Sequence, residues 1–321
     1  MRIVVMSCRR HVTALGLAAL AVTGVAACGS GTGTATDGSR RLAVSAAFYP
    51  LEYLVHRVGG DHVEVQGLTK PGGEPHDIEL TPRQVGAMAT ADLVVYEKGF
   101  QPAVDQAVRQ DAARQAFDVS PAADLSLVST EDGHDHAGES ASAHAAHAAV
   151  DPHFWLDPQR YAAVATAVAD RLAALDPAHA TAYRDNAAGL RADLTALDGQ
   201  YRTGLASCRS KDLVTSHAAF GYLAQRYGLH QEGITGLDPE AEPNPAELAA
   251  VAAHVRAVGA RTIYAETLVS PAVADTLARE TGARVAVLDP IEGITSDSRG
   301  TDYLAVMRSN LQVLRSGQEC S

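Results

Sequence analysis

Single histidines stand beside turn-forming residues in two distant stretches of the 321-residue sequence, GGEPHD at 72–77 and DPHFWLDP at 151–158. Proline, glycine and acidic residues fix the local backbone, so turns rather than packed helices present His76 and His153. An imidazole held in this way is suited to binding a ligand at a fixed point. A lone loop histidine is more often solvated, so this interpretation depends on partners elsewhere in the chain.

Two further candidates follow strand-like runs in the second half of the chain: His217 follows DLVTS, and Asp289 follows ARVAVL. In open α/β sheets, ligands bind beyond the carboxyl ends of the strands, so the four side chains are expected to meet in a cleft between two lobes. Three neutral imidazoles and a carboxylate form a tetrahedral set suited to Zn²⁺, whereas Mn²⁺ would recruit more oxygen ligands. Asp289 precedes Pro290, and its alternative role is to hold a turn.

Alternating strand and helix patterns predict the elements that must position these residues. HVEVQGL and DLVVYEKG are typical of strands, PLEYLVHRVGG and TPRQVGAMATA of helices, and the second half repeats this rhythm. The pattern predicts an α/β fold of two lobes, each with a mostly parallel sheet flanked by helices. A long run of helix formers lies between the halves, with Pro177 expected in the first turn of a new helix. We expect an N-terminal lobe at 41–175, one long connecting helix at 176–205 and a C-terminal lobe at 206–321.

The segment 125–150 interrupts this pattern, because EDGHDHAGESASAHAAHAAV has no apolar periodicity. We interpret it as a loop inserted in the N-terminal lobe. Its histidines either bind metal weakly and transiently, as an auxiliary site, or belong to a disordered tract. These histidines are His134, His136, His144 and His147.

The N-terminus has the features of a secretion signal at 1–27. Three arginines precede an apolar run from Val12 to Ala27, which is short for a membrane span, and a single-pass anchor is the alternative. The run ends in VAAC, which resembles a bacterial lipobox. Lipidated Cys28, followed by a flexible Gly/Ser/Thr tether at 28–40, would anchor a secreted protein to the outer face of the cell membrane.

Cys8 is removed with the signal peptide, and Cys28 is the expected site of lipidation. Cys208 and Cys320 are the two cysteines that remain. In an oxidising compartment this pair predicts a disulfide, with free thiols or a thiolate metal site as the alternative. The formal charge of −12 becomes −15 when the three arginines of the signal are removed. This acidic balance disfavours nucleic acid as a partner.

Several motifs together resemble the solute-binding proteins of bacterial metal ABC transporters, in their zinc-uptake branch. They cover the chain from Leu42 onwards and include LTKPGGEPHDIELTP, DPHFWLDP, VTSHAAFGYLAQRYGL, YAETLVSPAVADTLARETGA and VLDP. The resemblance implies two α/β lobes joined by a long helix, a histidine-rich loop and an ABC permease as partner. It also implies four metal ligands, namely His76, His153, His217 and Asp289.

Two departures leave the fourth donor open. Pro75 stands where some zinc-binding relatives have an acidic residue before the first ligand, and Glu74 is one place further back. The fourth donor could be Asp289, a carboxylate such as Glu74, or water. Glu266 in YAETLVSP approaches the same cleft, and we expect it to orient a histidine N–H.

The function expected from these features is capture of Zn²⁺ and its delivery to a permease by a monomeric, non-enzymatic protein. A zinc hydrolase is the alternative from another class, because three histidines and an open position also describe a catalytic site. The chain has no HExxH or GxSxG motif. A metal-binding adhesin or scavenger of the same fold is a further alternative.

Overall fold

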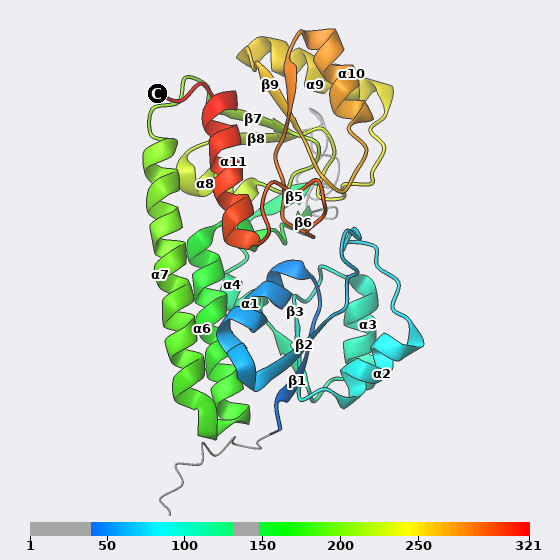
Figure 1. Ribbon diagram of the computed structural model, residues 1–321. Coiled ribbons are helices and arrows are strands. Elements are labelled where there is room, and N and C mark those ends of the chain that lie inside the picture. Colours follow the sequence, from blue (N-terminus) through cyan, green and yellow to red (C-terminus); the bar gives the residue numbers. More distant parts are fainter. Residues whose placement is uncertain (1–39, 131–147) are drawn as a thin grey trace, which may run out of the picture. The chain divides into compact units, whose positions relative to one another are not determined.

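The computed structural model describes residues 40–130 and 148–321 (Figure 1). The predicted signal peptide, the tether with Cys28 and the histidines at 134, 136, 144 and 147 lie outside the described residues. No helix in the described ranges is long and apolar enough to cross a membrane.

The N-terminal lobe contains a four-stranded parallel sheet in the order β2-β1-β3-β4. Local sequence explains where its helices begin. Thr81 caps α2 through the backbone N–H of Gln84, whose side chain in turn accepts from the Thr81 backbone, and Pro82 occupies the first turn. The strands are β1 (Leu42–Ala46), β2 (Val63–Gly67), β3 (Leu93–Tyr96) and β4 (Ala116–Asp118). The helices are α1 (Tyr49–Gly59), 3₁₀ helix η1 (Gly60–His62), α2 (Pro82–Thr90), α3 (Pro102–Asp111) and α4 (Ser120–Ala123).

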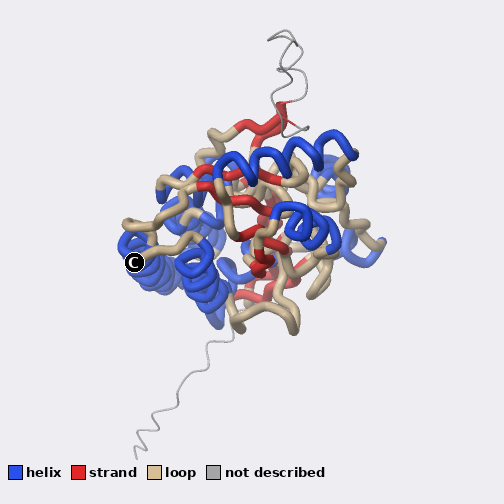
Figure 2. The backbone as a smooth tube through the Cα atoms, turned by 90° about the horizontal axis from the view of Figure 1, so that it is seen from above, coloured by secondary structure: helices blue, strands red, loops and turns tan. Residues whose placement is uncertain are grey.

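The C-terminal lobe repeats this plan with a parallel sheet in the order β10-β9-β7-β8. Asn244 and Glu247 form a capping box at the start of α9, and Gly259 ends that helix in a left-handed conformation. The strands are β7 (Asp212–Thr215), β8 (His230–Gly233), β9 (Thr262–Ala265) and β10 (Arg284–Val287). The helices are α8 (Gly221–Tyr227), α9 (Pro245–Val258), α10 (Ala272–Thr281) and α11 (Tyr303–Gly317). In the view from above, helices lie on both sides of the strands (Figure 2).

Two long helices follow the N-terminal lobe in the sequence and lie side by side along one edge of the molecule (Figure 1). The first is α6 (Pro158–Leu175), which Asp157 caps by accepting from the Gln159 backbone N–H. The second is α7 (Ala180–Gly204), and the 3₁₀ helix η3 (Pro177–His179) leads into it. The predicted fold, two parallel-sheet lobes with one long connecting helix, is confirmed.

The segment predicted as a loop at 125–150 is partly a hairpin. β5 (Val128–Thr130) and β6 (Ala148–Val150) pair in antiparallel register on either side of the residues that are not described. Three-residue strands have too little alternation to be recognised in a sequence, and their pairing connects residues about 20 positions apart. Val128 and Val150 form one cross-strand pair and are both largely exposed.

The core is continuous between the two lobes. One cluster of buried residues includes side chains from the N-terminal sheet, from α6, α7 and α11, and from the loop after β10. Tyr303 of α11 packs on Tyr161 of α6 with ring centroids 4.5 Å apart, and its hydroxyl donates to the Trp155 carbonyl at 2.5 Å. A second cluster lies within the C-terminal lobe.

The predicted disulfide is present. Cys208, just after α7, is bonded to Cys320, three residues after α11 ends. The backbone of these two residues also forms an antiparallel bridge. The end of the chain is thereby fastened to the start of the C-terminal lobe.

Candidate metal centre

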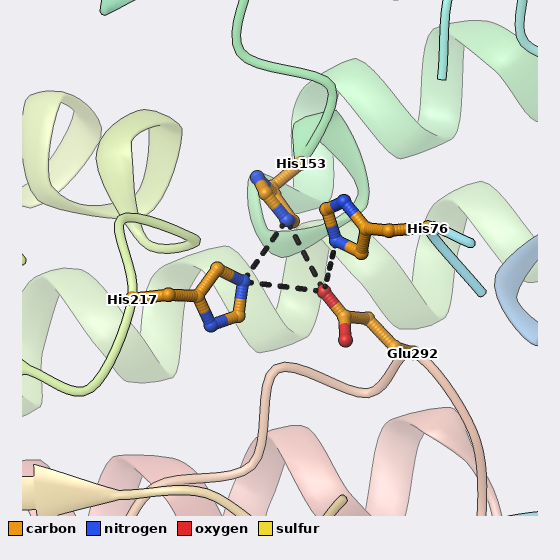
Figure 3. A group of neighbouring side chains, drawn as sticks. All are labelled: His76, His153, His217 and Glu292. Carbon is orange, nitrogen blue, oxygen red and sulfur yellow. Dashed lines mark hydrogen bonds and ion pairs between the residues drawn. The ribbon is translucent and has the colours of Figure 1, made fainter. Parts of the chain in front are cut away.

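Three imidazoles and one carboxylate converge between the lobes (Figure 3). His76 lies in the loop between β2 and α2, and His153 directly precedes the 3₁₀ helix η2 (Phe154–Leu156). From the other lobe, His217 follows β7 and Glu292 follows β10. One ligand atom from each of these four residues lies within 4.8 Å of each of the others.

Each of the four side chains directs one metal-binding atom towards a common point. The Nε2 atoms of His76, His153 and His217 lie 3.1, 3.2 and 3.3 Å from Oε1 of Glu292. The Nε2 atoms of His153 and His217 are 3.3 Å apart. Three nitrogens and one oxygen around a common centre form the donor set that a tetrahedral divalent cation requires.

Carboxylates hold the outer sides of two of the rings. Nδ1 of His153 is 2.8 Å from Oδ1 of Asp151, which also accepts from the His153 backbone N–H. Nδ1 of His217 is 2.7 Å from Oε1 of Glu266, which accepts from the His217 backbone N–H at 3.0 Å. A carboxylate at Nδ1 favours the tautomer with its proton there, leaving the Nε2 lone pair directed into the centre.

The centre is almost entirely removed from solvent. The side chains of His153 and His217 are 0% exposed and that of Glu292 is 1% exposed, whereas His76 retains 13%. Burial opposes charge on His153, His217 and Glu292, but their close pairing outweighs it. Three imidazole contacts hold the pKa of Glu292 well below its ordinary value. The pKa of His217 is raised well above its ordinary value by Glu266 and Glu292.

His153 follows the same balance. Burial lowers its pKa, but Asp151 and Glu292 together raise it above the ordinary histidine value. The pKa shifts of His153, His217 and Glu292 therefore all favour positive charge beside the Glu292 carboxylate. A divalent cation at the same point would supply that positive charge directly.

Three of the four predicted residues meet in this group, and Asp289 is not among them. Oδ1 of Asp289 accepts from the Ile291 backbone N–H at 2.8 Å, and Oδ2 accepts from the Ser298 hydroxyl at 2.8 Å. The carboxylate beside the imidazoles belongs to Glu292, three residues further on. The sequence VLDPIEG contains two acidic residues, Asp289 and Glu292. The backbone conformation of the residues between them determines that Glu292 points into the centre.

The two other acids singled out in the sequence lie next to the centre. Glu266 supports His217, as described above. Oε1 of Glu74 accepts from the His76 backbone N–H at 2.9 Å and lies 3.9 Å from His76 Nε2. Burial raises the pKa of Glu74. Glu74 thus shapes the turn that carries His76 and is not one of the four converging residues.

Residues 44–317 match the family ZnuA, described as zinc-uptake complex component A periplasmic. The chain belongs to this family. The high-affinity zinc uptake system protein ZnuA of Bacillus subtilis (strain 168) is 35% identical over 296 residues, a match that covers 91% of this chain and 92% of the relative. The zinc-binding protein AdcA of Streptococcus pyogenes serotype M3 is 36% identical over 287 residues. That match covers 86% of this chain but 56% of AdcA, so the chain spans about half the length of these streptococcal relatives.

Solved structures of family members share the fold. The Zn(II)-bound ZnuA-like domain of Streptococcus pneumoniae AdcA superposes with a TM-score of 0.70 at 32% identity, over 87% of this chain and 100% of that one. The laminin binding protein Lmb of Streptococcus agalactiae is described as bifunctional, with adhesin and metal transporting activity. It gives a TM-score of 0.74 at 32% identity, over 86% of this chain and 99% of that one.

In this family member, the centre reaches the surface beside His76. A groove of about 540 Å³ is lined by residues of both lobes, among them His76, Asp77, Val150 and Asp238. His76 is the most exposed of the four converging residues, so it forms the wall between the groove and the buried centre. The groove thus combines this imidazole with two acidic side chains at the surface.

Proposed function

We propose that the protein binds one Zn²⁺ through Nε2 of His76, His153 and His217 and a carboxylate oxygen of Glu292. The observation that carries this proposal is the convergence of these four atoms within 4.8 Å of one another at a buried point. Imidazole nitrogen is a borderline donor that suits Zn²⁺ far better than Mg²⁺ or Ca²⁺. A single carboxylate gives fewer oxygen donors than Mn²⁺ would be expected to recruit.

The same geometry favours binding and delivery over catalysis. A catalytic zinc site keeps one position open for water or substrate, whereas four protein ligands close a tetrahedral site. The nearby acids Asp151 and Glu266 face imidazole nitrogens, so neither is placed to activate a water molecule. We therefore interpret the protein as a carrier of Zn²⁺ rather than a zinc hydrolase.

Membership of a zinc-uptake family supports a proposal for where the protein acts and what it passes zinc to. We infer that a lipid on Cys28 tethers the protein to the outer face of the cell membrane. There it would work as a monomer, collecting Zn²⁺ and passing it to an ABC permease. One relative of similar sequence is named a zinc-binding lipoprotein, AdcA of Streptococcus pneumoniae serotype 4.

Titration calorimetry of metal-free protein with Zn²⁺ and Mn²⁺ tests the binding proposal. We expect one tight zinc site that His217→Ala weakens by more than about 100-fold, because the loss of a direct ligand exceeds that of an outer hydrogen-bond partner. His230→Ala is the matched control, since that imidazole is 77% exposed. Affinity should fall as pH decreases, because protons compete for the imidazole nitrogens. Equal zinc affinity of the His217→Ala and wild-type proteins would refute the assignment.

Cell fractionation tests the anchor independently of the metal site. The variant Cys28→Ala should leave the membrane fraction and retain full zinc affinity, since the lipid is proposed to act only as a tether. Cells that lack the endogenous protein should recover growth under zinc limitation with the wild-type chain, and should fail to recover with His217→Ala. Recovery with His217→Ala would argue against zinc delivery as the function.

A further inference from the structure

The loop that carries Glu292 contains a strained residue. Ile291 is completely buried and has a φ of 60°, in the left-handed region. In the described part of the chain, the other non-glycine residues with positive φ are Asp124 and Glu319, neither of which is β-branched. A β-branched residue is disfavoured in this conformation because its side chain crowds the backbone, so surrounding contacts must hold it there.

Asp289 makes the contact that holds Ile291 most directly. Its Oδ1 accepts from the Ile291 backbone N–H at 2.8 Å, and the Ser298 hydroxyl donates to its Oδ2 at 2.8 Å. Asn310 of α11 fixes the backbone of Asp289 from the other side. Its amide donates to the Asp289 carbonyl at 2.6 Å and accepts from the Asp289 N–H at 3.1 Å.

The same turn is tied to the opposite lobe through Trp155. The indole N–H of Trp155 donates to the Pro290 carbonyl at 2.8 Å in a buried environment. Trp155 lies two residues after His153, and Pro290 lies two residues before Glu292. This hydrogen bond therefore connects the loop of one converging histidine to the loop of the converging carboxylate.

The direction of the Glu292 side chain depends on this turn. Glu292 follows Ile291 directly, and its Oε1 reaches three Nε2 atoms at 3.1–3.3 Å. If Ile291 returned to negative φ, the chain after it would take a different direction and the carboxylate would leave the three imidazoles. The strained turn is thus required for the fourth donor and not for the three histidines.

We propose that Asp289 is a positioning residue that holds Ile291 in its left-handed conformation, so that Glu292 is presented as the fourth ligand of the cation. Trp155 supports the same turn from the N-terminal lobe. This inference rests on the proposed zinc-binding function. It gives Asp289 a role in metal binding without direct contact with the metal.

A double-mutant cycle tests the proposal, with zinc affinity measured by competition with a chromophoric chelator. Asp289→Ala should weaken zinc binding by about 10- to 100-fold, the range seen when support for a ligand is lost. Asp289→Asn should bind nearly as tightly as wild type, because an amide oxygen can still accept from the Ile291 N–H. In a Glu292→Gln background, Asp289→Ala should cause no further loss, because both substitutions remove the same fourth donor.

The visible spectrum of bound Co²⁺ reports on the ligands of the metal, and a general loss of protein stability would not change it. The Co²⁺ spectrum of Asp289→Ala should resemble that of Glu292→Gln rather than that of wild type. Trp155→Phe retains an aromatic ring and removes only the indole donor, so it serves if Asp289→Ala does not fold. It should weaken zinc binding in the wild-type background and have no effect beside Glu292→Gln.

Two results would overturn the inference while leaving zinc binding itself intact. One is an additive loss from Asp289→Ala and Glu292→Gln, which would mean that Asp289 acts independently of Glu292. The other is a loss with Asp289→Asn as large as with Asp289→Ala, which would mean that the negative charge of Asp289 matters. Failure of the proposed function is distinct, because the wild-type protein would then not bind Zn²⁺.

Discussion

At the scale of single residues, the three histidines differ in how firmly they are held. Asp151 supports His153 and Glu266 supports His217 at their Nδ1 atoms, and both rings are fully buried. His76 is more exposed and faces the groove. The two buried histidines therefore form the inner part of the centre, and His76 forms the part that borders the groove.

Glu266→Gln isolates the contribution of an outer carboxylate. The amide can still accept from His217 but carries no charge, so it should make that imidazole a poorer donor. We expect zinc affinity to fall by about tenfold with little change in the free energy of unfolding. Titration calorimetry and urea denaturation measure the two quantities. Glu240→Gln, at an exposed position, is the control, and equal affinities of the two variants would contradict the role of Glu266.

The histidines could be predicted from the sequence because each stands in or after a segment whose residue types indicate a turn or a strand. Proline and glycine mark the turn of His76, and a strand pattern precedes His217. Glu292 could not be predicted in the same way. Its approach depends on the positive φ of Ile291, and nothing in the type of that residue indicates a left-handed conformation.

At the scale of elements, a network of charges fastens the long helices to the C-terminal lobe. Nε of Arg226 on α8 lies 2.6 Å from Asp198 of α7 and 3.2 Å from Asp157, the cap of α6. Arg202 and Tyr227 also donate to Asp198. Because only the 3₁₀ helix η2 separates Asp157 from His153, this network also steadies one side of the metal centre.

The contribution of this network to protein stability can be measured with Asp198→Asn, because that contribution should depend on pH. Burial disfavours the Asp198 carboxylate, but the hydrogen bonds from Arg226 and Arg202 outweigh it and lower its pKa. A carboxylate whose pKa is lower in the folded state stabilises the fold at pH values above its unfolded-state pKa of about 3.9. That stabilisation is lost as the pH falls below this value and through the lower folded-state pKa. At pH 7 we expect the variant to lose about 1–3 kcal/mol of unfolding free energy. In urea denaturation, a difference from wild type that does not shrink towards pH 3 would contradict this account.

The elements themselves were largely predictable, and the exceptions have a physical cause. TPRQVGAMATA, which the sequence pattern predicts to be a helix, forms α2 behind a capping box of Thr81 and Gln84. The hairpin of β5 and β6 was not predicted, because three residues per strand carry almost no periodic signal. The convergence of the two lobes followed from the general rule for parallel sheets and not from any single motif.

At the scale of the whole described chain, the shared core limits how far the lobes can separate. Buried residues of both lobes and of the connecting helices form one cluster, and a hinge motion would expose part of it to water. Trp155 adds to this coupling, because its indole donates to Pro290 of the other lobe and its carbonyl accepts from Tyr303 of α11. Binding of a cation should therefore change loops near the centre more than the arrangement of the lobes.

Two measurements on one sample test this expectation. Small-angle scattering profiles with and without Zn²⁺ should be nearly superimposable, because a large closure would require breaking the continuous core. Trp155 is the single tryptophan of the sequence, and its ring lies 5.1 Å from that of His153, so its fluorescence should respond to the same titration. A clear decrease in the radius of gyration on zinc binding would show that the lobes close as rigid bodies. A fluorescence change without a change in scattering would place the response in the loops of His153 and Glu292, which the indole of Trp155 joins.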